Sequence, residues 1–540
     1  MEAGTLRARL AAIPALMQRW PALTAIALGL IAACAYPPLH LWPLGLAALA
    51  GFVWLIYTAP TKRAALWLGW CFGWAHLTLA NNWIATAFTH QAKMPEVLGW
   101  AAVPLLCIYL AWYPAFAALA AHVLAKKRPL WAFGLVFAGA WIVTEWLRGW
   151  AFTGYPWPPL GLMLLGGWEA PGFGRLLPWM GTYVLSGLAI LMGTGLAAAT
   201  TRRRLSDMIV PLAAMAFVMH IPNFATLQST DIRYTLVQPL LKQSEINDAS
   251  KFEEQFARIA ALTTPGQNQS RIVLWPESAI PDYLEDGYPE RYYFQVTAGA
   301  DPEFARKRLG RVIGPQSTLL TGVVNLDIGT REDGSQGAVS ARNSVIALNS
   351  EGEITASYAK AHLVPYGEYL PMRDLLEPLG LSRLVAGSID YQPGSGPRTI
   401  DLGVHGKVGL QICYEIVFSG EVTDRANRPD FLFNPSNDGW FGSWGSPQFV
   451  GQSRMRAIEE GLPVLRSTTT GISAVIDANG IVRNHIGPGK ADAVEGMVPA
   501  AKPPTLFARA GHWLTFGWAL MLIALGLGLP RVLALIRARG

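Results

Sequence analysis

Eight long apolar stretches constrain this chain more than any other feature of its sequence. Seven precede residue 225 and one lies near the C-terminus, and each is close to the ~20 residues that cross a bilayer as a helix. The predicted spans are 21–36, 41–58, 65–88, 97–124, 130–150, 176–200, 208–224 and 511–530. The chain is 51% hydrophobic and only 15% charged, against roughly 25% charged residues in soluble domains. We therefore predict a multi-span α-helical membrane domain with eight transmembrane helices.

Short clusters of Lys and Arg between the spans predict their orientation. The clusters contain Arg7, Arg9, Arg19, Lys62, Arg63, Lys126, Lys127, Arg128, Arg202, Arg203, Arg204, Arg531, Arg537 and Arg539. If all eight stretches cross, every cluster lies on one side, and such clusters mark the cytoplasm. Both termini are then cytoplasmic, and the segment between spans seven and eight is extracytoplasmic. The net charge of +6 is spread over these clusters, so no nucleic-acid partner is expected.

The N-terminus also permits a second interpretation. Arg residues precede an apolar run, and Ile31-Ala32-Ala33-Cys34 resembles a lipoprotein cleavage box after a signal peptide. A first transmembrane helix is favoured, because more spans follow and the alternation of charge requires it.

Residues 226–505 form a different kind of segment, polar and punctuated by Gly and Pro. Strand candidates are 232–238, 271–275, 318–326, 343–349, 354–359, 407–413, 430–434 and 472–477, and a helical pattern covers about 250–262. Asn479-Gly480 is a strong hairpin signal. Strands mixed with helices predict a layered α/β sandwich. The predicted domains are 1–225 with seven helices, 226–505, and 506–540 with the eighth helix and a cytoplasmic tail.

Cys413 is the only cysteine of residues 226–505, because Cys34, Cys71 and Cys107 lie in predicted spans. A thiol without a local disulfide partner is a liability in an oxidising compartment unless it is buried or used. Cys413 lies at the end of a predicted strand, where the active sites of α/β sheets tend to lie. By itself this position suits a buried inert cysteine and a nucleophile equally well.

Two further predicted strands end in ionisable residues, Glu277 and Lys360. A nearby cation lowers the pKa of a thiol, and a carboxylate can carry protons to and from sulfur. Alone, each residue is more often a surface charge, but three such strand ends together favour an active site. His362 is an alternative base for Cys413, since His is the commonest general base.

Several ordered motifs resemble a known family. Leu274–Ser278, Tyr358–Lys360 and Gln411–Glu415, with longer matches over Lys360–Pro371 and Asn434–Gly442, resemble the carbon–nitrogen hydrolase (nitrilase) superfamily. These motifs follow seven predicted spans and precede an eighth. In that arrangement they resemble the apolipoprotein N-acyltransferase family of the Gram-negative inner membrane. Glu145–Trp150 and Thr153–Trp157 resemble the membrane part of that family. The resemblance covers essentially the whole chain and implies a periplasmic, nitrilase-like αββα sandwich.

The resemblance implies an acyltransferase in lipoprotein biosynthesis. Cys413 would be the nucleophile, Glu277 the general base and Lys360 the third catalytic residue, while Glu368 would support Lys360. Tyr414 and Glu415 flank the nucleophile and would shape its pocket. The expected reaction moves the sn-1 acyl chain of a phospholipid, typically phosphatidylethanolamine, through a thioester to the α-amine of a diacylglyceryl-cysteine apolipoprotein. No cofactor or metal is expected, because no metal-ligand spacing or nucleotide loop occurs, and a monomer is expected because nothing demands an oligomer.

Two stretches are candidates for an apolar lid over a lipid site, with ordinary core packing as the alternative for both. One contains Tyr283, Tyr288, Tyr292, Tyr293 and Phe294, and the other contains Leu375, Leu376, Leu379, Leu381, Leu384 and Val385. Leu379 and Leu381 of the second stretch are candidate substrate-binding residues, and so is Trp440 of the Asn434–Gly442 motif. Glu145 and Arg148 in span five are expected to hold a lipid headgroup or each other. The family often has a tryptophan after Val237-Gln238, where Asn247 stands here.

Two other classes of protein fit parts of the sequence. A membrane-anchored amidase or nitrilase-type hydrolase would use the same three residues, but one anchor would suffice for it. A non-enzymatic scaffold or transporter is disfavoured, because the motifs are intact and the spans lack the broken, polar-lined helices of transporters.

Overall fold

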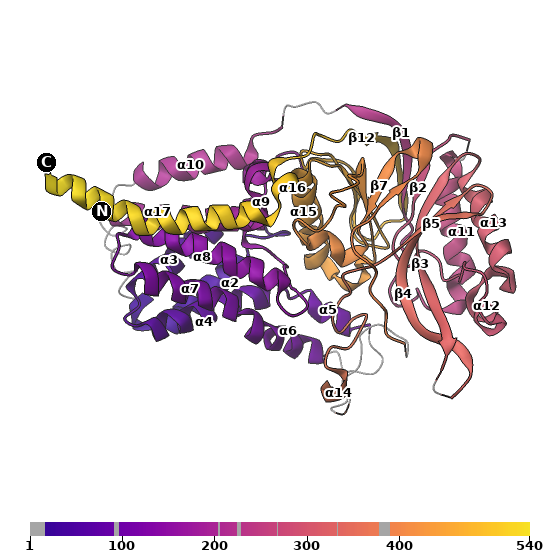
Figure 1. The fold of residues 1–540 in the computed structure, drawn as a ribbon, viewed down its shortest axis with the longest axis horizontal. Helices are drawn as coiled ribbons and strands as arrows, with labels where there is room; N and C mark the ends of the chain where they lie inside the picture. Colours follow the sequence, from indigo (N-terminus) through magenta and orange to yellow (C-terminus); the bar gives the residue numbers. More distant parts are fainter. Residues whose placement is uncertain are drawn as a thin grey trace, which may run out of the picture. The chain divides into compact units, whose positions relative to one another are not determined.

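The computed structural model describes residues 17–90, 97–202, 206–223, 228–266, 268–331, 333–376, 378 and 389–539. The chain divides into two compact units (Figure 1). The first comprises Met1–Ala85, Val97–Pro222 and Ala510–Gly540, and the second comprises Thr86–Glu96 and Asn223–Arg509. The short segment Thr86–Glu96 therefore belongs to the second unit, although residues 86–88 were predicted to end the span 65–88, which was predicted too long because the helix α4 (Lys62–Ala80) ends at Ala80.

The first unit is helical. Its longer helices are α2 (Pro21–Ala33), α3 (Trp42–Thr58), α4 (Lys62–Ala80), α6 (Val97–Leu110), α7 (Trp112–Ala125), α8 (Leu130–Trp150), α9 (Leu177–Arg202), α10 (Ser206–His220) and α17 (His512–Arg539). Each predicted span overlaps one of them, except that α6 and α7 share the fourth. Gly139 lets α8 and α17 approach closely, since a Cβ there would lie 2.7 Å from the Ala519 carbonyl oxygen.

Length and composition separate these helices into two groups. Within the described residues, four segments are long and apolar enough to cross a membrane: Val97–Ala125, Leu130–Trp150, Gly172–Thr200 and His512–Ile536. Pro21–Ala33, Trp42–Thr58 and Ser206–His220 are apolar but shorter. The first unit therefore has the composition of a membrane domain.

The second unit contains two six-stranded sheets. The first has the order β12-β1-β2-β3-β4-β5 and the second the order β11-β10-β9-β8-β7-β6. The strands of the first sheet are β1 (Ser229–Gln238), β2 (Ile272–Leu274), β3 (Thr318–Thr330), β4 (Gln336–Asn349), β5 (Ile354–Ala359) and β12 (Asp492–Pro499). Those of the second are β6 (Thr399–Asp401), β7 (Lys407–Leu410), β8 (Phe431–Ser436), β9 (Val464–Thr468), β10 (Ser473–Ile476) and β11 (Val482–Ile486). Three parallel strands form the centre of each sheet, and antiparallel strands flank them.

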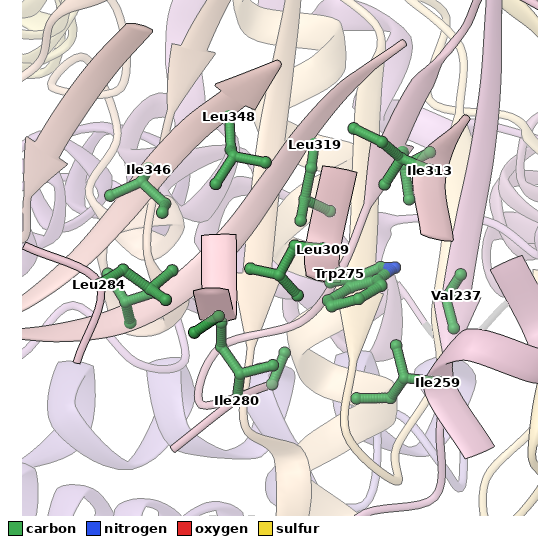
Figure 2. Packing of buried hydrophobic residues seen from close by; sticks show 14 of the residues in the cluster. Val237, Ile259, Trp275, Ile280, Leu284, Leu309, Ile313, Leu319, Ile346 and Leu348 are labelled. Atoms are coloured by element: carbon green, nitrogen blue, oxygen red, sulfur yellow. The ribbon is translucent and has the colours of Figure 1, made fainter. Parts of the chain in front are cut away.

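Helices cover the outer faces of the two sheets. Figure 2 shows Trp275 and Leu319 of the first sheet packed with Ile259 of α11 (Phe252–Thr263) and Leu309 of α13 (Pro302–Ile313). The second sheet packs against α15 (Gly442–Glu460).

The inner faces of the two sheets meet through hydrogen bonds between β1 and β9. The Ser467 hydroxyl donates to the Val237 carbonyl at 2.6 Å, and the Thr468 hydroxyl donates to Gln238 Oε1 at 2.9 Å. The unit is an αββα sandwich, which confirms the predicted fold class of this part of the chain. Because both faces of each sheet are covered, the central strands β2, β8 and β9 are buried along their whole lengths.

All eight predicted strands overlap an observed strand, but 407–413 was predicted three residues too long, and β6, β9, β11 and β12 were not predicted. β5 coincides with 354–359, and the hairpin at Asn479-Gly480 joins β10 to β11. The predicted strand 407–413 ends at Leu410, and Cys413 begins the 3-10 helix η8 (Cys413–Val417). The apolar alternation continues to Ile412, but Asn434 Nδ2 donates to the Gln411 carbonyl oxygen at 2.5 Å and the Cys413 carbonyl oxygen at 3.2 Å. Side-chain hydrogen bonds therefore replace the β-ladder at this point.

Candidate active site

Three strands of the second unit end beside the candidate catalytic residues. Glu277 follows β2, Lys360 follows β5 and Cys413 follows β7. β2 and β3 are parallel, and β5 runs in the direction of β3 because each is antiparallel to β4. The carboxyl ends of β2 and β5 therefore lie at the same edge of the first sheet, which brings Glu277 and Lys360 together.

Lys360 is a buried cation between two carboxylates. Its side chain is 1% exposed, and Nζ lies 3.0 Å from Glu368 Oε2 and 3.8 Å from Glu277 Oε1. Burial by itself lowers the pKa of Lys360, but the charges of Glu368 and Glu277 outweigh burial and hold the pKa above its ordinary value. Lys360 is therefore positively charged at neutral pH.

Asn343 orients the two carboxylates. Its Nδ2 donates at 2.7 Å to Glu277 Oε1 and at 2.7 Å to Glu368 Oε1. Glu277 Oε2 accepts a hydrogen bond of 2.8 Å from the Asn437 backbone N–H. Each oxygen of Glu277 thus has a fixed donor, so the position of the candidate base is well defined.

The end of β8 connects this cluster to Cys413. Ser436 Oγ lies 3.5 Å from Cys413 Sγ, and the next residue, Asn437, contacts Glu277. Cys413 is 5% exposed. Burial and then the charge of Glu277 raise the pKa of the Cys413 thiol, while the charge of Lys360 acts in the opposite direction. At neutral pH the resting sulfur is therefore a thiol, and a base must remove its proton before it can attack.

Glu415 fixes the turn that carries Cys413. Its Oε2 accepts from the Ile412 backbone N–H at 2.8 Å, and its Oε1 accepts from the Tyr358 hydroxyl at 2.9 Å and the Ala361 backbone N–H at 2.7 Å. These contacts tie the nucleophile turn to the chain on both sides of Lys360. The backbone of Cys413 has a φ of 48°, a left-handed conformation that is strained for a residue with a Cβ and is held by its surroundings.

Sequence comparisons agree with this architecture. Residues 28–195 match the apolipoprotein N-acyltransferase N-terminal domain, and residues 236–492 match the carbon–nitrogen hydrolase family. An apolipoprotein N-acyltransferase of Bradyrhizobium diazoefficiens is 33% identical over 91% of this chain and 91% of its own length. The enzyme of that name from Rhodopseudomonas palustris is 30% identical over 91% of this chain and 92% of its own length. The chain belongs to the apolipoprotein N-acyltransferase family.

Membership of the apolipoprotein N-acyltransferase family confirms the predicted class of activity. The chain is an acyltransferase that acts in the N-acylation of lipoproteins, and its apolar helices are those of a membrane protein. The structure of Saccharomyces cerevisiae Nit3, a nitrilase superfamily member, is 18% identical with a TM-score of 0.35 over 51% of this chain and 91% of that chain. A score this low adds no support of its own.

The contacts of His362 do not favour it as the base. Its ring stacks on Phe418 with centroids 4.2 Å apart, and its Nε2 lies 3.2 Å from Glu421 Oε2. Tyr414, next to the candidate nucleophile Cys413, is buried and packs edge-on against Phe418 with centroids 5.1 Å apart. The rings of His362 and Tyr414 therefore both pack on Phe418, close in the chain to the turn that contains Cys413.

Glu145 and Arg148 contact each other in the first unit. Arg148 Nη2 lies 3.7 Å from Glu145 Oε1, which also accepts the Leu160 backbone N–H at 2.8 Å. Arg148 donates to the Pro158 carbonyl oxygen at 2.8 Å. Both side chains are buried. These contacts favour the predicted pairing of the two residues, in which they anchor the loop after α8, over a lipid headgroup site.

Of the other candidate substrate-binding residues, the structure describes Trp440 but not Leu379 or Leu381. Trp440 is half-buried, and the edge of its ring meets His90 with centroids 5.7 Å apart. Leu379 and Leu381 lie outside the described residues, as does most of the apolar stretch that contains them. Asn247 is exposed in a turn after β1.

The aromatic stretch is packing rather than a lid. The Tyr288 hydroxyl accepts from the Leu326 backbone N–H at 2.9 Å, and the Tyr292 hydroxyl accepts from the Ala338 backbone N–H at 2.7 Å. Tyr288 also stacks on Tyr293. These residues support the long β3–β4 hairpin, so the lid interpretation of this stretch is not favoured. Phe294 differs from the tyrosines of this stretch, because its side chain is 74% exposed.

Sequence reasoning missed Asn343, Ser436 and Asp438. Asn343 begins a predicted strand, and Ser436 and Asp438 lie in the Asn434–Gly442 motif, so a signal existed for the latter two. The hydrogen-bond partners of these three residues could not be predicted from the sequence.

Among the residues that the structure describes, no group of three or more His, Cys, Asp or Glu side chains is arranged to hold a metal.

Proposed function

We propose that this acyltransferase moves the sn-1 acyl chain of a phospholipid, phosphatidylethanolamine, to the α-amine of the N-terminal diacylglyceryl-cysteine of an apolipoprotein. The acyl chain passes through a thioester on Cys413 in a two-step, ping-pong reaction. The observation that carries the proposal is the convergence of a buried cation, Lys360, and a carboxylate, Glu277, on the thiol of Cys413.

In the first step Glu277 takes the proton of the Cys413 thiol, and the sulfur attacks the ester carbonyl. Lys360 and a backbone N–H near Cys413 or Tyr414 stabilise the resulting oxyanion. The C–O bond of the ester breaks, Glu277 returns the proton to the departing oxygen, and a lysophospholipid leaves. The acyl chain remains on sulfur as a thioester.

In the second step the α-amine of the diacylglyceryl-cysteine attacks the thioester carbonyl. Glu277 takes a proton from the attacking nitrogen, the C–S bond breaks, and the proton passes to the departing sulfur. An amide is released and the thiol is regenerated. Glu368 and Glu415 act through other residues: Glu368 holds Lys360, and Glu415 holds the turn at Cys413.

The proposed topology has eight membrane-spanning helices, with both termini in the cytoplasm. The second unit then lies on the periplasmic side of the inner membrane, where lipid and lipoprotein substrates are both available, and the enzyme acts as a monomer. The alternation of Lys and Arg clusters supports this arrangement. Labelling of single cysteines introduced at residues 62 and 490 with a membrane-impermeant reagent tests it, because only the second should react in intact spheroplasts.

Mass spectrometry tests the chemistry. The purified full chain is incubated with phosphatidylethanolamine and then with a diacylated lipopeptide, with Cys413→Ala as the matched control. An acyl adduct on Cys413 that the lipopeptide discharges as an amide is expected. Discharge by water at the same rate would instead indicate a hydrolase, and absence of any adduct in the folded wild-type protein would exclude the thioester mechanism.

A further inference from the structure

The hydroxyl of Ser436 lies between the nucleophile and a second acidic residue. Ser436 Oγ is 3.5 Å from Cys413 Sγ and 2.8 Å from Asp438 Oδ1. All three side chains are buried. The family resemblance assigned roles to Glu277, Lys360 and Cys413 but none to Ser436.

A hydroxyl has one hydrogen, so Ser436 can donate to only one of these two acceptors at a time. A neutral thiol is a weak acceptor, and the carboxylate of Asp438 then receives the hydrogen. A thiolate is a charged and much stronger acceptor. Formation of the thiolate therefore favours rotation of the hydroxyl toward sulfur, with no change in the heavy atoms.

Asp438 has other partners that stabilise its carboxylate when the Ser436 hydroxyl no longer donates to it. Its Oδ1 is paired with Arg466, and its Oδ2 accepts from the Ser446 hydroxyl at 2.6 Å. Arg466 also donates to Asn434 Oδ1 at 2.5 Å, which keeps the guanidinium in place. Asp438 is therefore stabilised by a charge and a second hydroxyl while Ser436 is turned away.

The charged groups facing Cys413 come from three elements. Glu277 after β2 and Asp438 after β8 disfavour a thiolate, whereas Lys360 after β5 favours it. Ser436 adds a neutral donor in direct contact with the sulfur. This contact stabilises the thiolate without adding a charge that would compete with the oxyanion for Lys360.

We infer that Ser436 is a further catalytic residue, whose hydroxyl switches from Asp438 to Cys413 Sγ whenever the sulfur is ionised. The sulfur is ionised twice in the proposed reaction: as the nucleophile that attacks the ester, and as the group that leaves when the amine attacks the thioester. Ser436 transfers no proton in either step and donates only a hydrogen bond, while Glu277 carries the proton. The two lipid steps rest on the proposed function, but the switch is a property of the thiol itself.

Alkylation of Cys413 by iodoacetamide tests the inference on the full chain in detergent. The rate of modification is followed by mass spectrometry of the Cys413 peptide between about pH 8 and 11, where the thiolate fraction of a thiol with a raised pKa increases with pH, because only the thiolate reacts. Ser436→Ala removes the donor, and Ser436→Thr keeps it. Ser436→Val is matched to Ser436→Thr in shape, so a packing defect affects both and the difference between them reports the hydroxyl. Ser467→Ala is the control, since Ser467 is a buried serine that donates to the Val237 carbonyl oxygen.

The Ala and Val variants are expected to alkylate roughly tenfold more slowly than the wild type at each pH of this range, because the thiolate loses a hydrogen-bond donor and its fraction falls. Ser436→Thr and Ser467→Ala are expected to follow the wild type. Coincident profiles for Ser436→Val and Ser436→Thr would overturn the inference.

This experiment is independent of the lipid chemistry. A wild-type protein with the expected alkylation profile but no acyl adduct from phosphatidylethanolamine would contradict the proposed function and leave the role of Ser436 intact. An acyl adduct in a protein whose Ser436→Val and Ser436→Thr variants alkylate identically would do the reverse.

Discussion

The ammonium of Lys360 lies 3.0 Å from the carboxylate of Glu368, and both side chains are buried. Glu277 is farther from the same ammonium, at 3.8 Å. Glu368 is therefore the principal counter-ion of Lys360. Glu277 is less tightly paired with Lys360, which suits its proposed role as the base for Cys413.

Glu368→Gln is expected to lower acyl transfer by about 10²-fold or more, since Glu277 must then balance Lys360 and becomes a poorer base. The rate of acyl adduct formation on Cys413 is the measurement. Glu254→Gln, in the exposed pair with Arg258, is the control and should leave the rate unchanged. An unimpaired Glu368→Gln variant would contradict the assignment of Glu368 as the counter-ion.

Asn343→Ala is expected to lower the rate of the first step about 10-fold to 100-fold, because two carboxylates lose a shared donor. Asn343→Asp should be more damaging, since it adds a third acid beside Glu277 and Glu368. Single-turnover acylation measures both variants. Asn325→Ala, which removes a weak contact of 3.4 Å with Glu285, provides the comparison. The opposite order of the two Asn343 variants would argue against this role.

Removing the contact between His90 and the loop that contains Trp440 is expected to lower the rate of acyl transfer. His90 Nε2 lies 3.2 Å from the Gly439 carbonyl oxygen, and the nearby Asn437 backbone N–H holds Glu277. His90→Ala is expected to lower kcat about 3-fold to 10-fold, and His90→Gln, which can still donate, to restore most of it. The exposed His220, whose Nδ1 bonds the Ala216 carbonyl oxygen of its own helix, supplies the control as His220→Ala. Equal kcat for His90→Ala and the wild type would show that the contact is dispensable.

Glu460 is expected to make the stability of the protein depend on pH. Burial and then the charge of Glu459 raise the pKa of Glu460 from 4.5 to about 7. The folded state therefore binds the proton more tightly than the unfolded state, and this group's favourable contribution is present below about pH 4.5 and lost as pH rises through about 7. The loss is on the order of 3 kcal/mol.

Thermal unfolding in detergent at several pH values between about 5 and 8 checks this expectation. The Tm of the wild type should fall relative to that of Glu460→Gln as pH rises, because the amide cannot ionise. Parallel Tm profiles for the two proteins would show that Glu460 does not titrate in this range.

Some of the site was predictable because its residues lie at strand ends within recognisable motifs. Strand 354–359 and the buried run before Pro276 locate Lys360 and Glu277 by local pattern alone. The strand leading to Cys413 was extended too far, because apolar alternation continues through Ile412 while the backbone has already turned. The hydrogen bonds from Asn434 that cause the turn come from a different strand, 21 residues along the chain from Cys413.

The hydrogen-bond partners of the candidate catalytic residues could not be predicted from local sequence pattern, because they lie far away in the chain. Asn343 and Glu277 are separated by 66 residues, and Asn437 and Glu277 by 160. Hydropathy assigned residues 86–88 to a span, whereas Thr86–Glu96 belongs to the second unit. The contact that His90 makes there is with Gly439, 349 positions along the chain, and local pattern does not report it.

The sequence by itself determined the membrane character of the chain, the presence of an α/β domain and which cysteine is the candidate nucleophile, because hydrophobic length, strand periodicity and ordered motifs are properties of neighbouring residues. The tertiary structure alone decided which carboxylate neutralises Lys360, what holds the strained turn at Cys413 and which hydroxyl touches its sulfur. Such pairings depend on the register of strands distant in the chain, and their energies arise only when folding removes the paired groups from water.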